Sequence, residues 1–73
     1  MDDSADLAQA HILLSALREH IDHVSRLIEV AQQRRRGALH PTDAEKALRR
    51  DLYEAHRHVE RLYERFPQTR DRA

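Results

Sequence analysis

The chain has 73 residues, with 13 basic and 13 acidic side chains, so its formal net charge is zero. A chain of this length forms at most one small domain, and its balanced charge gives no net positive field to attract nucleic acid or an anionic membrane. It has no cysteine, one glycine and two prolines, which excludes disulfides and thiolate metal sites and favours long helices over sheets. The acidic N-terminus and the absence of a long apolar run predict no signal peptide and no membrane segment. We therefore expect an all-α protein located in the cytoplasm.

The first predicted helix runs from about residue 4 to about residue 36. Its apolar residues repeat at spacings of three and four over four heptads: Leu7, Ala10, Leu14, Leu17, Ile21, Val24, Ile28 and Ala31. At its start, Asp2, Asp3 and Ser4 offer side-chain oxygens to the first backbone N–H groups of the helix. At its end, Gly37 can adopt the left-handed conformation that closes a helix.

The second predicted helix covers about residues 43 to 66 and follows a turn over residues 37–42. Thr42 and Glu45 have the spacing of a capping box, in which each side chain accepts a hydrogen bond from the other residue's backbone N–H. The apolar residues are again spaced by four and three: Leu48, Leu52, Ala55, Val59, Leu62 and Phe66. Pro67 ends the pattern, and we expect residues 67–73 to form a flexible tail.

A short connection between two long amphipathic helices favours an antiparallel two-helix hairpin. The expected core consists of the apolar residues on the facing sides of the helices: Leu14, Leu17, Ile21, Val24, Ile28, Leu48, Leu52, Val59 and Leu62. The first helix carries further apolar residues beside this seam, including Leu13, Ala16, Leu27 and Val30. One partner helix cannot cover so wide a face. We therefore expect a homodimer in which two hairpins form a four-helix bundle.

This architecture favours a small non-enzymatic protein–protein interaction module, an adaptor or regulator that presents a helical face to a larger protein partner. A two-helix hairpin encloses no pocket for a substrate, so we expect no catalytic residues and no cofactor. The candidate partner-binding residues are Ile12, Leu13, Leu27, Val30 and Tyr53. The competing interpretation places Leu13 and Leu27 in the core of the dimer and makes the exposure of Ile12 and Tyr53 incidental.

Six histidines are the most unusual feature of the composition. His20 and His23 lie three residues apart on the first helix, so both rings project from one side and could bind a divalent transition metal. His56 and His58 are two residues apart and diverge on a regular helix. Solvated histidines are the ordinary interpretation, and a metal-binding helical bundle is the alternative function. Histidines beside a dimer seam would also become charged between about pH 7 and pH 5 and loosen the interface.

Basic residues near the helix ends raise nucleic-acid binding as another alternative: Arg34, Arg35, Arg36, Arg70 and Arg72. Acidic residues are interleaved with arginines along the second helix, as in Glu45 and Arg49, which is typical of a solvated helix with i, i+4 ion pairs. The arginines at the end of the first helix also complement the negative end of the helix dipole. We therefore expect no nucleic-acid partner.

The stretch from Ala16 to Asp22, followed by Arg35, resembles the first helix of the all-helical chorismate mutases. The resemblance covers about thirty residues and implies that Arg18, Arg35 and Lys46 hold the two carboxylates of the family's substrate. Four positions depart from the family's pattern: Gly37, Pro41, His58 and Val59. The first two interrupt a helix that the family continues, the other two replace an arginine and an acid, and the family's third helix with its glutamine is missing. A truncated domain of this kind is a further alternative function.

Overall fold

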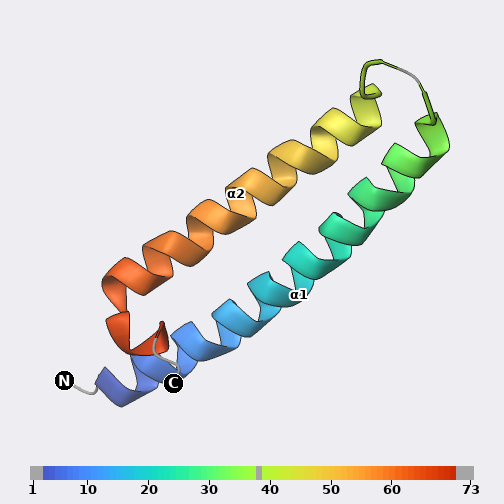
Figure 1. The fold of residues 1–73 in the computed structure, drawn as a ribbon. Helices are drawn as coiled ribbons and strands as arrows, with labels where there is room; N and C mark the ends of the chain where they lie inside the picture. The colour runs from blue at the N-terminus through green and yellow to red at the C-terminus, as the bar shows by residue number, and fades with distance from the viewer. Residues whose placement is uncertain (1–2, 38, 71–73) are drawn as a thin grey trace.

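The protein is a pair of antiparallel helices joined by a short loop, seen in a computed structural model that describes residues 3–37 and 39–70, without the side chain of Asp3. Helix α1 covers Asp3–Arg35, helix α2 covers Asp43–Arg65, and a 3-10 helix, η1, covers Pro67–Thr69. The two long helices lie side by side (Figure 1). The predicted all-α hairpin is confirmed, and each helix begins and ends within one residue of its predicted bounds.

The loop between the helices is closed by two local features. Gly37 has a positive φ of 71°, a conformation that costs glycine little because it has no Cβ. Thr42 caps α2, since its hydroxyl accepts a hydrogen bond from the Glu45 backbone N–H at 3.1 Å. The second half of the predicted capping box is wrong, because the Glu45 carboxylate turns toward two arginines instead. The predicted capping role of Asp2 and of the Asp3 side chain lies outside the described residues.

The core is a single seam between α1 and α2. Its buried apolar residues all belong to the three-four spacing pattern: Ala10, Leu14, Val24, Ile28, Ala55 and Val59. Other members of the expected core are only partly covered in the single hairpin: Leu17, Ile21, Leu48, Leu52 and Leu62. Two helices cover the seam from two sides only, so its flanks remain open to solvent.

The molecule is elongated, with extents of 55 × 18 × 17 Å. Its radius of gyration is 15.9 Å, whereas a compact domain of this length would have a value of about 11 Å. An elongated shape exposes more surface per residue than a compact one and buries less apolar area. The hairpin therefore retains a large accessible surface beside a narrow core.

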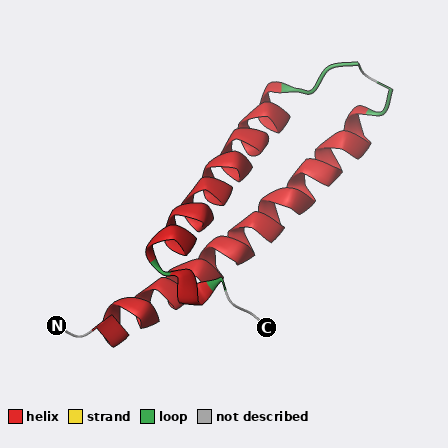
Figure 2. Cartoon of the chain, turned by 60° about the vertical axis from the view of Figure 1, so that its left-hand side comes forward, coloured by secondary structure: helices red, strands yellow, loops and turns green. Residues whose placement is uncertain are grey.

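Residues 67–70 differ from the expected flexible tail. They form η1 and a following turn, in which the Thr69 hydroxyl donates to the Phe66 carbonyl at 2.8 Å and Thr69 itself is buried. The segment folds back across the first turns of α1 (Figure 2). The Arg70 guanidinium lies 4.9 Å from the centre of the Tyr63 ring. The rest of the expected tail, residues 71–73, lies outside the described part of the chain.

Candidate functional site

A second stripe of residues follows α1 beside the seam, and we call it the outer strip. Its six members are spaced by three, four, three, four and three residues: Leu13, Ala16, His20, His23, Leu27 and Val30. All six are exposed in the hairpin, and the three large apolar side chains retain 39–47 % of their accessible surface. The apolar members lie at the two ends of the strip, and exposed apolar side chains on one face of a helix form a surface available for packing.

Each end of the outer strip opens into a groove shared with α2. Near the chain termini, Leu13 and Ala16 line a groove with Leu62 and Phe66. Near the loop, Leu27 and Val30 line a second groove, together with Ala44 and Leu48. The apolar surface therefore continues from α1 onto the adjoining side of α2. We define the outer face as the outer strip together with Ala44, Leu48 and Leu62 of α2 and with Phe66, which caps the C-terminal end of α2.

The middle of the outer face is polar. The Nε2 atom of His20 lies 2.9 Å from the Oδ2 atom of Asp51 on α2, and both side chains are about half exposed, at 44 % and 50 %. His23 is exposed one turn further along the outer strip. The histidine pair proposed from the sequence therefore sits between two apolar grooves and has a carboxylate beside it.

The other histidines of the two helices do not join this pair into a larger cluster. His11, His56 and His58 are all exposed. Within residues 3–37 and 39–70, no group of three or more histidine, aspartate or glutamate side chains is close enough to hold a metal ion. One chain therefore supplies at most the two imidazoles of His20 and His23 to a metal site on the outer strip.

Tyr53 is separate from the other candidate partner-binding residues. It is 63 % exposed and lines a polar hollow on α2, where the Arg57 guanidinium lies 5.9 Å from the centre of its ring. Ile12 is also exposed and lines the groove near the termini, next to Leu13. The structure therefore places the α1 candidates along or beside the outer strip, and it places Tyr53 elsewhere.

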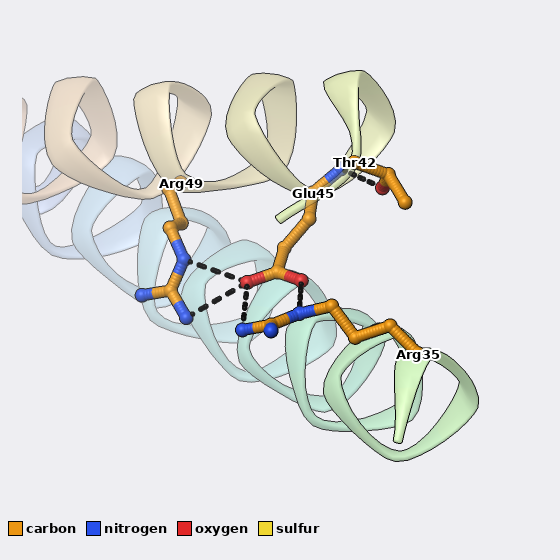
Figure 3. A network of polar contacts seen from close by, with 4 residues as sticks. All are labelled: Arg35, Thr42, Glu45 and Arg49. Carbon is orange, nitrogen blue, oxygen red and sulfur yellow. Dashed lines mark hydrogen bonds and ion pairs between the residues drawn. The ribbon is translucent and has the colours of Figure 1, made fainter. Parts of the chain in front are cut away.

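An ion cluster joins the two helices at the loop end (Figure 3). The sequence predicted its Glu45–Arg49 pair as an i, i+4 pair on a solvated helix, whereas the structure buries Glu45 and adds Arg35 from α1, which was not predicted. The Arg35 Nε atom donates to the Glu45 carboxylate at 2.7 Å, and Arg49 donates to it through two nitrogens at 3.1 Å. The Glu45 side chain has no exposed surface. The hydrogen bond from Arg35 lowers the pKa of Glu45 below its usual value, burial opposes this change, and Arg49 adds to it.

A register count could have found this cluster. Arg35 lies seven residues after Ile28, and Glu45 lies seven residues before Leu52, so both continue the heptad positions that face the seam. The apolar pattern of the first helix ends before Arg35, and that of the second helix begins after Glu45, so a search for apolar residues alone passes over both. Opposite charges at the last seam position of the first helix and the first seam position of the second indicate an ion pair at the loop end of an antiparallel hairpin.

The cations implied by the resemblance to chorismate mutases lie apart. Arg18 donates to the Tyr63 hydroxyl at 2.9 Å, and Arg35 belongs to the ion cluster with Glu45. Arg18 and Arg35 are 17 residues apart on one helix, a separation of about 25 Å at 1.5 Å per residue. A single chain therefore does not bring these two cations around one small dicarboxylate.

Neither long helix, over the residues described, is apolar enough for its length to cross a membrane. No protein-family model, curated protein or solved structure matches this chain.

Proposed function

We propose that this chain is a small non-enzymatic protein–protein interaction module, whose outer face binds a second copy to form a four-helix bundle. The observation that carries this proposal is the outer face itself, an apolar surface beside a seam whose residues are only partly covered. Two hairpins stacked through this face would shield both grooves and the open flank of the seam. Tyr53 lies outside the outer face and would stay exposed on both copies of the dimer.

The order of residues along the outer strip favours a second copy as its occupant. Leu13 and Val30 are equally distant from a point between residues 21 and 22, and so are Ala16 and Leu27. A two-fold axis at that point, perpendicular to α1, would pack α1 antiparallel against the same helix of the second copy. Leu13 would then face Val30 of the other chain, and Ala16 would face Leu27. Each apolar side chain meets an apolar partner, as a self-complementary interface requires.

The charges at the edge of the outer strip support the same antiparallel arrangement. Glu19 and Arg26 are both exposed, and their midpoint lies within one residue of the midpoint of the strip. Antiparallel pairing would place Glu19 of each chain opposite Arg26 of the other, so the attraction would occur twice. A parallel two-fold arrangement would place these residues of the two chains on opposite edges of the interface, so they would not meet.

The proposal is tested first by the solution mass of the purified chain and then by cross-linking. We expect light scattering to give the mass of a dimer at about pH 7.5. Because the chain has no cysteine, the double variant Leu13→Cys/Val30→Cys should form a covalent dimer on mild oxidation.

The single variant Leu13→Cys is the matched control for the cross-link. In the antiparallel dimer its two sulfur atoms would be separated by about 25 Å along the helix axis, far beyond the reach of a disulfide. A monomeric mass would contradict the proposal. Cross-linking of the single variant as rapid as that of the double variant would contradict the antiparallel register.

A further inference from the structure

We propose that the two-fold axis of this dimer carries a site for a divalent transition-metal ion of the zinc class, formed by His20 and His23 of both copies. The site rests on the proposed function, because each chain supplies only two imidazoles and the second copy must supply the other two. Histidine nitrogen is a common ligand of zinc, and structural zinc sites in proteins are almost always four-coordinate and tetrahedral.

The positions of the two histidines place them at the axis. His20 and His23 are the central pair of the outer strip, each at the same distance from its midpoint. The packing that sets Leu13 against Val30 therefore also sets His20 against His23 of the second copy. Along the helix axis the two histidines of one chain are separated by about 4.5 Å. Four rings from two chains would thus surround the axis within a single helical turn.

The contact with Asp51 gives His20 a tautomer suited to binding a metal. Its Nε2 atom lies 2.9 Å from a carboxylate oxygen, and an ionised carboxylate only accepts hydrogen bonds, so a neutral His20 donates from Nε2. The lone pair of the ring is then on Nδ1, which is free of that hydrogen bond. A carboxylate that orients a histidine through its second nitrogen is a recurrent feature of metal sites, because it sets the ring orientation and increases the basicity of the ligand.

The surroundings of the histidines also favour a metal. Apolar residues lie on both sides of them along the outer strip. In a dimer without metal, two layers of imidazoles would be enclosed between apolar layers, and each ring nitrogen left without a hydrogen bond would cost stability. A metal ion would bind the four lone pairs at once. The same histidines would then stabilise the dimer when metal is bound and weaken it when metal is absent.

The test is a zinc titration of the full-length chain after chelator treatment, at about pH 7.5, followed by calorimetry and light scattering. We expect one zinc ion for every two chains. We also expect saturating zinc to lower the dissociation constant of the dimer by at least about tenfold. Cobalt in place of zinc should show the visible absorption of tetrahedral coordination.

Substitutions assign the response to the proposed ligands. His20→Ala and His23→Ala should each abolish the tightening by zinc, whereas the controls His11→Ala and His58→Ala should keep it. His23→Leu should have two effects. It should lower the dissociation constant of the metal-free dimer, because an apolar side chain replaces an imidazole at the axis, and it should remove the response to zinc. A purely structural role for His23 would not produce these opposite effects.

The outcomes separate the two proposals. A stable dimer that does not respond to zinc would overturn the metal site and leave the proposed dimer standing. Binding of one zinc ion per chain would also overturn the metal site but not the dimer. A response to zinc that persists in the double variant His20→Ala/His23→Ala would have the same meaning. A chain that stays monomeric with and without zinc would overturn both.

Discussion

At the loop end of the hairpin, the Glu45 carboxylate occupies a position that faces the seam and is fully covered there by two guanidinium groups. Arg35 and Arg49 together donate four hydrogen bonds to its two oxygens. Charge-assisted bonds of this kind compensate the loss of hydration of the carboxylate. Arg35 comes from α1, whereas Glu45 and Arg49 come from α2, so the cluster connects the last turn of one helix to the first turn of the other.

The lowered pKa of Glu45 predicts a specific dependence of stability on pH. The carboxyl group titrates near its usual value of 4.5 in the unfolded chain and below that value in the folded one. Between these values the unfolded state binds more protons, so the stability contributed by the ionised group is complete above about pH 4.5 and is lost as the pH falls through the folded pKa. Wild type should therefore exceed Glu45→Gln in free energy of unfolding at neutral pH, and this difference should shrink in acid.

Chemical denaturation of both proteins from about pH 7 to pH 3 measures that difference. Glu54→Gln is the matched control, because Glu54 is exposed on the same helix and belongs to no such cluster. The free energy of unfolding of Glu54→Gln should stay close to that of wild type at neutral pH. A difference between wild type and Glu45→Gln that stayed constant down to pH 3 would show that the cluster does not form in solution.

At the scale of the elements, the two long helices contribute differently to the seam and to the outer face. Helix α1 presents the seam residues to α2 and carries the outer strip on its flank. Helix α2 contributes Ala44, Leu48 and Leu62 to the outer face, and most of its exposed residues are charged. Adjacent residues of α1 can therefore serve different interfaces. Leu14 has 2 % of its surface exposed, whereas its neighbour Leu13 has 47 %.

This contrast predicts different results for the same substitution at neighbouring positions. Leu14→Ala should lower the free energy of unfolding by about 2 to 4 kcal/mol, because it leaves a cavity in the seam between α1 and α2. Leu13→Ala should change the helical content little at low protein concentration but raise the dissociation constant of the dimer. Circular dichroism melts over a range of protein concentrations distinguish the two effects. Equal loss of helix in both variants would mean that the seam and the outer strip are not separate interfaces.

At the scale of the whole molecule, the elongated shape leaves the hairpin with one narrow seam and an open flank. Burial of apolar surface is the main contribution to the stability of a small domain, and a second copy would increase it without any change of fold. In the proposed dimer, the direction in which the two hairpins run is set by the order of apolar and charged residues along α1.

A charge exchange tests that direction. Glu19→Arg alone and Arg26→Glu alone would each place like charges opposite each other twice in the antiparallel dimer, raising its dissociation constant roughly fivefold at low salt. The double variant Glu19→Arg/Arg26→Glu restores both pairs and should recover most of the affinity. Sedimentation equilibrium of the four proteins measures these constants. A double variant no better than either single variant would show that these two residues do not meet.

The sequence by itself determined the two helices, their bounds, the glycine that closes α1 and the threonine that caps α2. Each of these depends on residues close together in the chain, through heptad spacing or a hydrogen bond across three residues. The apolar residues on two sides of α1 could also be read from the spacing, because a regular helix sets the direction of every side chain.

Only the tertiary structure decided which side chains meet between the helices. Glu45 could have completed the capping box within its own helix, but Arg35 from α1 lies within reach and its charge binds the carboxylate more strongly. The contacts of His20 with Asp51 and of Arg18 with Tyr63 also join side chains from different helices. In the same way, η1 packs against α1, which is distant in the sequence, and its residue Thr69 is buried. Local periodicity sets the direction of a side chain within its own helix, whereas its partner depends on the axial offset of the two helices, which the packed seam determines.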